Sequence, residues 1–494
     1  MATQVSSDST LRRNLKQRHI SLIAIGGTIG AGLFVGSGVV IHDTGPAAII
    51  SFLLAGVLAV LVMRMLGEMA VARPAVGSFY EYGRLALGHR GGFAIGWLYW
   101  YFWVIVVAVE STAGAAILHA WLPAVPLWLL SLGLMVLMTL TNLASVRSYG
   151  EFEYWFSSIK VVAICAFIAV GLIFIIGLWP GSHASVANLT QHGGFFAQGI
   201  GTAFSGVVPA IAFFTGAEIA TIAAAESREP ARSVAKATNS VVLRVLLFYV
   251  GSIFIVVVIR PWNSNSVLAS PYVSALHTIG IRGAGTVMQV IILTAVLSSL
   301  NSGLYTTSRI LFALTSRGDA PQAFTKLTRR GVPARAILLG TIVGYISAIM
   351  SYLSPTAVFA FLIHSYGAVA LFVYLLIAVS QLRLRARLQR ESPEDLQLKM
   401  WFYPYLSWVT IIGMGIVIVA MGFIQSTRLD FLISLLTVVV VLCAYELQRR
   451  VGRARRDTGN LAAAPVLRGT HEATGNVLGR AQAVSDDTGD APAS

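Results

Sequence analysis

Long apolar runs dominate the chain, and short segments rich in polar residues, glycine and proline separate them. A helix needs about 20 apolar residues to cross the hydrocarbon core of a bilayer, and about twelve runs approach that length. The pattern predicts an all-α polytopic membrane protein with twelve transmembrane helices. Their predicted ranges are 20–40, 46–66, 92–118, 126–146, 154–178, 199–225, 240–260, 283–312, 335–354, 356–381, 402–424 and 428–448.

Composition agrees with this prediction. Of the 494 residues, 56% are hydrophobic and only 11% are charged, whereas about 25% charged residues are usual in a soluble domain. An ordinary soluble enzyme, a disordered chain and a disulfide scaffold are therefore excluded. Cys165 and Cys443 lie within apolar runs, where small buried hydrophobic residues are expected rather than redox or metal sites.

The basic residues indicate how the helices are oriented. The net charge is +14, and nearly all Lys and Arg residues fall on one side of the predicted membrane. Arg260, Arg282 and Arg428 fall on the other side, and Lys160 lies within a span. Basic loops face the cytoplasm and anionic lipid, so we expect a multi-pass protein of the cell (inner) membrane with both termini cytoplasmic. The charge then calls for no nucleic-acid partner.

The chain divides into one large domain and two tails. Residues 1–19 are expected to form a cytoplasmic N-terminal tail, because the first apolar run is too long and too rich in glycine for a cleavable signal. Residues 20–450 form the predicted twelve-helix domain. From 451 to 494 the composition shifts to Ala, Gly, Asp, Thr and Arg, which is typical of a flexible cytoplasmic tail.

Motifs for common chemistries are missing from the sequence. A phosphate-binding loop needs a Gly-Lys pair, which occurs nowhere in the chain, and the His-Glu-x-x-His zinc signature is also missing. We therefore expect no ATP use, no metal, no cofactor and no enzymatic activity.

The first span is unusually rich in glycine. Residues 26–38 read GGTIGAGLFVGSG, with six glycines in thirteen positions, and each glycine costs a helix about 1 kcal/mol relative to alanine. One interpretation is close helix packing through the small-xxx-small spacing. The other is a broken helix whose free backbone groups line a cavity and bind the charged groups of a solute.

A second interruption is predicted in the sixth span, at Phe213-Phe214-Thr215-Gly216-Ala217-Glu218. The first and sixth spans begin two successive sets of five, covering about 20–178 and 199–381, with spans eleven and twelve at 402–448. Interrupted helices at corresponding places in two halves are typical of the central site of a secondary transporter. Because each set has an odd number of helices, the two repeats must be inverted.

Three ionisable residues lie well inside predicted spans, where each costs about 2.5 to 3.5 kcal/mol. Lys160 is either part of a structural ion pair with another helix or, since desolvation favours its neutral form, a proton carrier. Glu153, a candidate structural or gating residue on the same helix, is about 10.5 Å away along the axis, which is too far for direct contact, so the partner of Lys160 is expected on another helix. Glu218 either ties the broken helix to its neighbours or contacts a solute. Glu110 either faces the ammonium of a bound zwitterion or pairs internally.

These segments resemble those of the amino acid/polyamine/organocation superfamily, and within it the bacterial amino acid permeases. The resemblance covers about residues 15–445. It is carried by the glycine-rich run at 26–38, GPA at 45–47, RMLGEMA at 64–70, GWLYW at 96–100, YGEFE at 149–153 and SRGDAP at 316–321. Permeases for 4-aminobutyrate (GABA) are most similar at 216–227, 237–241, 370–375 and 378–383, although some of these segments recur in permeases for other amino acids.

The resemblance implies a leucine-transporter-like fold of five plus five inverted helices and two peripheral ones. It also implies a substrate carboxylate at the first interruption, at Thr28, Ile29, Gly30, Ala31 and Gly32. Carbonyl groups for the amine would come from the second interruption, at Phe214, Thr215, Gly216 and Ala217. Lys160 matches the lysine that replaces sodium in proton-coupled members.

Two further features bear on the substrate. Ala217 stands where several relatives carry a bulky aromatic gate, which leaves room for a longer substrate such as a γ-amino acid. The polar run at 298–302 contains Ser299 and Asn301, which are candidates for substrate binding or for helix packing.

The sequence thus predicts proton-coupled import of a small zwitterionic amino acid, with GABA as the first choice. Its partners would be that solute, protons and the lipid bilayer. Permeases for proline, β-alanine or an aromatic amino acid remain alternatives. A channel is less favoured, because it would show rings of like charge or a repeated filter, which the sequence lacks. A sensor is less favoured, because it would carry a folded output domain, and the tail after Tyr445 is too small and polar to form one.

Overall fold

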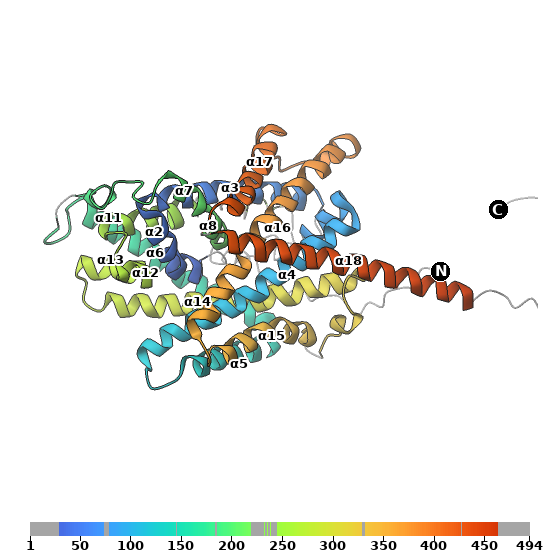
Figure 1. The fold of residues 1–494 in the computed structure, drawn as a ribbon, viewed down its shortest axis with the longest axis horizontal. Coiled ribbons are helices and arrows are strands. Elements are labelled where there is room, and N and C mark those ends of the chain that lie inside the picture. The colour runs from blue at the N-terminus through green and yellow to red at the C-terminus, as the bar shows by residue number, and fades with distance from the viewer. Residues whose placement is uncertain are drawn as a thin grey trace, which may run out of the picture. The chain divides into compact units, whose positions relative to one another are not determined.

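The computed structural model describes residues 29–73, 79–144, 146–182, 185–218, 245–328, 331–425 and 427–462, with the single residues Arg232, Ala235 and Thr238. Every regular element in these ranges is helical (Figure 1), which confirms the all-α prediction. Thr28, the N-terminal tail 1–19, most of the sixth span beyond Glu218 and residues 463–494 lie outside the described residues.

The described chain begins with three short helical pieces followed by one long helix. These are the π-helix η2 (Gly32–Gly36), α2 (Ser37–Thr44), the 3-10 turn η3 (Gly45–Ala47) and α3 (Ala48–Ala72). Gly45 has φ +68°, a conformation that glycine adopts without steric cost. The first two predicted spans are therefore joined by a turn of minimal length.

The remaining helices follow the order of the predicted spans. They are α4 (Phe79–Trp121), α5 (Leu127–Ala144), α6 (Val146–Ile175), η4 (Ala187–Leu189), α7 (Ile200–Ser205), α8 (Val207–Phe214), the π-helix η5 (Val245–Gly251), α11 (Ser252–Ile259), α12 (Asn265–Ala269), α13 (Pro271–Ile279), α14 (Ala284–Ser316), η6 (Gln322–Thr325), α15 (Ala334–Met350), α16 (Pro355–Glu391), η7 (Pro393–Asp395), α17 (Tyr405–Phe423) and α18 (Arg428–Ala462).

Eight helical segments of the described chain are long and apolar enough to cross a membrane. The first, Gly32–Ala72, contains the second predicted span and the described part of the first. Shorter apolar helices at Ile200–Phe214, Leu247–Ile259 and Ala334–Met350 occupy the sixth, seventh and ninth predicted spans. Every predicted span thus has a helical counterpart, and the protein is a multi-span helical membrane protein.

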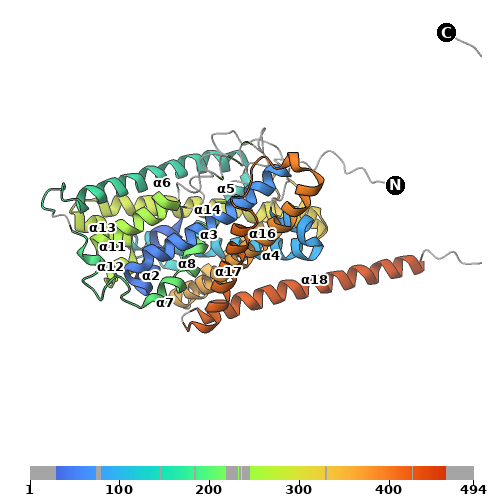
Figure 2. The same ribbon diagram turned by 90° about the horizontal axis from the view of Figure 1, so that it is seen from above.

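The helices α4 and α14 are the third members of the two predicted five-helix sets, and they pack against each other. The helix α4 also contacts α16 and α15, and Figure 2 shows α6 running beside α14 and α13. In its most apolar window, 78% of α4 is buried, against 28% of α17. The central position of α4 is why its side chains can reach both interrupted segments.

Several helices extend beyond their predicted spans: α4 begins at Phe79 rather than at 92, and α6 begins at Val146 rather than at 154. The longest extensions at the C-terminal end are those of α16 and α18. The helix α16 continues past 381 to Glu391, and α18 continues past 448 to Ala462. The extensions are rich in Arg, Leu, Gln and Ala, which favour helix but not burial in lipid. A search for apolar length finds only the membrane-crossing part of such helices.

A buried carboxylate holds α3 against α16. Glu68 of α3 accepts hydrogen bonds from Nε2 of Gln381 at 2.9 Å, from the guanidinium of Arg385 and from the backbone N–H of Met400. Ser407 of α17 donates to Oε1 of Gln381 at 3.0 Å. The carboxylate of Glu68 is thereby paired and the contacts link three helices, whereas an unpaired buried carboxylate would be strongly destabilising.

A second buried carboxylate, Asp319, lies just after α14. Its oxygens accept a hydrogen bond from the hydroxyl of Tyr80 and contact Nε2 of His89, and Nη1 of Arg84 lies 3.4 Å away. These three partners come from the beginning of α4, on either side of Gly88, whose φ of +79° kinks the helix. Asp319 therefore fixes the short first leg of α4 to the end of α14.

Candidate functional site

The first interruption predicted from the sequence falls at the beginning of the described chain, and the residues before Ile29 lie outside the described part. Ile29 and Gly30 are not helical, and η2 begins at Gly32. Gly30 has no room for a side chain, because a Cβ there would overlap Oγ of Ser299 and would lie 3.0 Å from Oε1 of Glu110. The fold therefore brings three predicted site residues together: Gly30, which precedes η2, Glu110 of α4 and Ser299 of α14.

Glu110 faces the N-terminal end of this first helix. It is buried in α4 and accepts a hydrogen bond from the backbone N–H of Ala31. Helix N-termini carry unsatisfied N–H groups and a partial positive charge, which stabilise an adjacent carboxylate. The second oxygen, Oε2, has no hydrogen-bond partner among the described residues.

Lys160 of α6 is a charged neighbour of Glu110. It is fully buried in α6 and interacts electrostatically with Glu153 and Glu110. Glu153 in turn accepts hydrogen bonds from Oγ of Ser298 at 2.7 and 2.8 Å and from Oγ of Ser157 at 3.0 Å. Glu110 belongs to a different helix from Lys160, so the three ionisable groups form one buried chain that links α6 to α4.

The second interruption follows α8. The helix ends at Phe214, Thr215 is extended with ψ of 131°, and Gly216 has φ of +120°. Only glycine adopts that φ without strain, so the helix stops where the sequence predicts a break. Phe214, Thr215 and Ala217 are all buried.

Hydrogen bonds close this second interruption on both sides. The hydroxyl of Tyr249 in η5 donates to the carbonyl of Phe213 at 2.8 Å. Oε1 of Glu218 accepts from the backbone N–H of Gly216 at 2.9 Å and from the hydroxyl of Tyr99 at 2.7 Å. Oε2 of Glu218 accepts from the hydroxyl of Tyr374 at 3.2 Å. Glu218 thus ties the broken segment to α4 and α16, in line with the first of the two interpretations.

Glycines of the first segment receive a side chain of the second. A Cβ on Gly32 would lie 2.5 Å from Cδ1 of Phe213, and one on Gly36 would lie 2.7 Å from Cζ of the same ring. This contact supports the close-packing interpretation of the glycine-rich run. Gly32 and Gly36 allow close packing, while Gly30 lies against the polar groups of Glu110 and Ser299.

Ser299 and Asn301 lie on different sides of α14. Ser299 faces Gly30, whereas Oδ1 of Asn301 accepts a hydrogen bond from Nδ2 of Asn142 in α5 at 2.8 Å. Two residues apart on a helix are separated by about 200°, so the two side chains cannot face one site. The structure brings Ser299, but not Asn301, to the first interruption.

Comparison with known proteins places this architecture in a family. Residues 19–457 match the family model described as amino acid permease. The chain belongs to the amino acid permease family. Over 93% of its length it is 52% identical to the gamma-aminobutyric acid permease of Bacillus subtilis, covering 97% of that protein. It is 44% identical to the gamma-aminobutyric acid permease of Escherichia coli K12, with 90% and 96% of the two chains covered. An aromatic amino acid transport protein of Corynebacterium glutamicum is 38% identical, with 89% and 96% covered.

Sequence reasoning about this permease missed several residues of the site. Tyr99, Tyr374 and Tyr249 hold the second interruption, and Asn142 holds Asn301. A signal existed for two of them, since Tyr99 lies in GWLYW at 96–100 and Tyr374 in the segment 370–375. Tyrosines within apolar runs usually find a hydrogen-bond partner, but the sequence does not say which.

The described residues contain no group of three or more His, Cys, Asp or Glu side chains suited to a metal ion. Around the predicted first interruption, the structure places the buried charges of Glu110 and Lys160 near the backbone N–H of Ala31.

Proposed function

We propose that this permease is a secondary active transporter that imports GABA, or another small zwitterionic amino acid, together with protons. In this proposal it resides in the cell (inner) membrane with both termini in the cytoplasm, and it alternately exposes one central site. Permeases with gamma-aminobutyric acid in their names are 52% and 44% identical to it. The distribution of Lys and Arg supports the orientation.

The observation that carries the proposal is the position of the Glu110 carboxylate, which extends from α4 to the start of the first described helix. One oxygen lies against Gly30 and the other has no partner among the described residues. A buried polar atom without a hydrogen bond costs about 1 to 3 kcal/mol. A solute ammonium would satisfy Oε2, and backbone N–H groups near Ala31 would receive the solute carboxylate.

A zwitterion suits this site because each of its charges meets an opposite one. The helix start is favourable for an anion, and the Glu110 carboxylate is favourable for a cation. The distance between the two charges of the solute would then select its length. The resemblance to other permeases places the buried Ala217 where several relatives carry a bulky aromatic residue, and the smaller side chain would leave room for a γ-amino acid.

Lys160 supports proton coupling. Its ammonium is fully buried and interacts with both Glu110 and Glu153, so a change in its protonation alters the field at the substrate site. A fixed cation in this place should repel Na⁺. A membrane voltage of 100 mV on one transferred charge is worth about 2.3 kcal/mol, enough for roughly 50-fold accumulation.

Uptake of labelled GABA into proteoliposomes tests the proposal. An imposed inward pH gradient should drive accumulation, a protonophore should abolish it, and replacing Na⁺ with K⁺ should leave it unchanged. Uptake that ignores the protonophore as well as Na⁺ would contradict coupling and would indicate a uniporter or exchanger.

A competition panel then tests the substrate. Unlabelled glycine, β-alanine, GABA and 5-aminovalerate differ only in the separation of amine and carboxylate, and proline and phenylalanine add bulk. We expect GABA to compete best. Stronger competition by proline or phenylalanine would assign the permease to another amino acid.

A further inference from the structure

An apolar groove lies away from the interrupted segments, between α6, α13 and α14. It has a volume of about 370 Å³ and is lined by Ala163, Ala166, Phe167, Val170, Leu276, Ile281, Arg282, Gly283, Ala284, Val287, Met288 and Ile291. Arg282 is the only polar side chain among these residues. A zwitterionic solute would lose its hydration there, and the lining would offer hydrogen bonds only from Arg282 and none to its ammonium group, so the groove does not suit a second substrate site.

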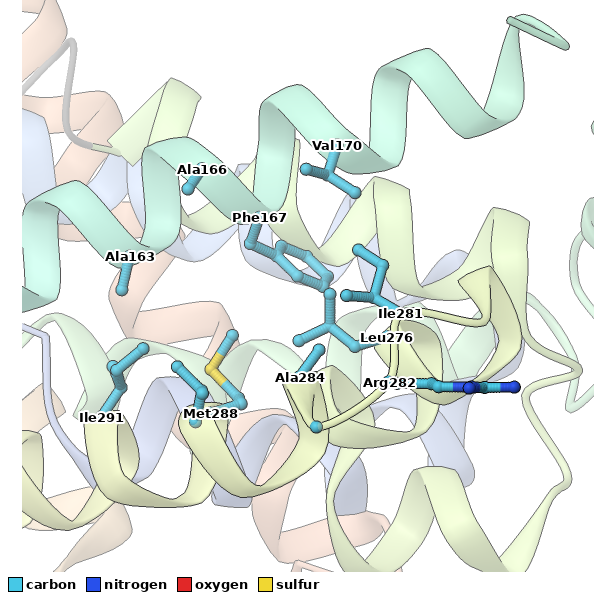
Figure 3. A pocket seen from close by; sticks show the side chains of 12 residues that line it. Ala163, Ala166, Phe167, Val170, Leu276, Ile281, Arg282, Ala284, Met288 and Ile291 are labelled. Atoms are coloured by element: carbon cyan, nitrogen blue, oxygen red, sulfur yellow. The ribbon is translucent and has the colours of Figure 1, made fainter. Parts of the chain in front are cut away.

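The groove is elongated and runs along two helices. Residues 163, 166, 167 and 170 of α6 face residues 284, 287, 288 and 291 of α14. Both sets follow the i, i+3, i+4, i+7 spacing of one helical face, which spans about 10.5 Å. Figure 3 shows Arg282 at one end of the groove, with Ala163 and Ile291 at the other.

The mouth and the floor of the groove differ in exposure. Val287 is 59% exposed and Ala166 is exposed, while Phe167 and Met288 are buried. In a multi-span membrane protein, an exposed apolar rim on a membrane-crossing helix faces lipid. The groove therefore opens sideways into the hydrocarbon of the bilayer.

Arg282 provides a positive charge at one end of this apolar groove. It is exposed, it lies in the turn between α13 and α14, and no hydrogen bond or ion pair joins it to another described residue. Its guanidinium points away from the apolar lining (Figure 3). Guanidinium groups bind phosphate through two parallel hydrogen bonds.

We propose that this groove binds an anionic phospholipid, with one acyl chain along α6 and α14 and the headgroup phosphate on Arg282. Charge complementarity and the opening toward lipid both favour this occupant over a second protein chain. A headgroup that adds negative charge to the phosphate should bind more tightly than one that cancels it with a cation.

The floor of the groove connects it to the first interruption. The ring of Phe167 packs on Tyr272 with centroids 4.8 Å apart, and Tyr272 packs edge-on against Phe34 of η2 at 5.0 Å. The hydroxyl of Tyr272 is hydrogen-bonded to Oγ of Ser252 at 2.8 Å. Lipid in the groove would thus support the packing of η2 from outside the site.

The test measures lipid retention on the purified full-length permease by native mass spectrometry. Phosphatidylglycerol and phosphatidylcholine with the same acyl chains are compared on the same protein. We expect at least a fivefold preference for phosphatidylglycerol, and Arg282→Ala should remove it. The matched control is Arg428→Ala, because Arg428 lies at the start of α18 and donates to the carbonyl of Gly422.

A second pair of variants tests the acyl chain. Ala166→Trp fills the groove and should reduce retention of both lipids, whereas Ala169→Trp places the same side chain at another exposed position of α6 that does not line the groove. Equal retention of both lipids by the unmodified protein, or a preference that survives Arg282→Ala, would overturn the proposal. So would displacement of the lipid by millimolar inorganic phosphate, since the site would then bind free phosphate.

Discussion

The two interrupted segments of this permease differ in how their free backbone groups are satisfied. At the second interruption, Tyr249 and Glu218 occupy the groups on either side of the break, and Tyr99 and Tyr374 hold Glu218 in turn. At the first, Glu110 contributes one oxygen to Ala31 and keeps the other without a partner among the described residues.

We therefore expect the first segment to bind the solute and the second segment to stabilise the fold. A break that is closed by its own protein keeps its shape whether or not a solute is present. A break with an unsatisfied buried carboxylate gains free energy when a solute supplies the missing partner. We therefore expect changes at the first segment to alter transport more than stability, and changes at the second to do the reverse.

The largest effect is expected from Lys160→Ala. This change leaves Glu110 and Glu153 buried without their cation, and breaking a buried pair costs about 3 to 5 kcal/mol. Accumulation of GABA driven by a pH gradient should fall at least tenfold in proteoliposomes. Counterflow, which exchanges substrate without net proton movement, separates loss of coupling from misfolding. Unchanged accumulation would remove Lys160 from the mechanism.

Glu110→Gln should come next. It keeps the shape of the side chain but removes the charge offered to a solute ammonium, and a charged hydrogen bond contributes about 1.5 to 3 kcal/mol. The apparent KM for GABA should rise roughly 10- to 100-fold, with a small change in the melting temperature.

Glu218→Gln is the matched comparison for that variant. It alters the buried acceptor of three hydrogen bonds at the second interruption, so the melting temperature should fall more than in Glu110→Gln and KM should change less. If Glu218→Gln raises KM as much as Glu110→Gln does, the proposed division between the two segments fails.

Gly32→Ala tests the contact between the two segments. Its Cβ would lie 2.5 Å from Cδ1 of Phe213, and overpacking of this kind costs about 1 to 3 kcal/mol. Thermal unfolding should occur at a lower temperature, with partial recovery in the double variant that adds Phe213→Leu. Gly133→Ala in α5 is the control, because its Cβ would meet no atom within 4 Å. Equal melting temperatures for the two alanine variants would contradict the packing.

The smallest effect is expected from Tyr249→Phe. It leaves the carbonyl of Phe213 without its donor, at a cost of about 1 kcal/mol, and should lower the melting temperature by a few degrees with little change in KM. Tyr405→Phe is the control, since Tyr405 is 77% exposed. A large rise in KM without a fall in the melting temperature would instead indicate that Tyr249 acts in substrate binding, as proposed for the first segment.

Much of the fold followed from local rules. The bilayer requires each span to satisfy its own backbone groups, so apolar length gave the helices, and Gly216 marked the end of α8. The glycine-rich run at 26–38 indicated a first span with weak helix propensity, because each glycine destabilises a helix relative to alanine. Helix ends were less accurate, because the polar extensions of α16 and α18 carry helix propensity without apolar character.

The sequence by itself therefore determined the class of protein, the order of its helices and the place where α8 ends. Only the tertiary structure decided which glycines pack against Phe213 and which one faces Glu110, that Glu218 is bound by two tyrosines, and that Asn301 faces α5 rather than the first interruption. The reason is physical: a helix break depends on neighbouring residues in the chain, whereas the partner of a buried polar group comes from another helix, 36 residues away for Tyr249 and Phe213 and 159 residues away for Asn142 and Asn301.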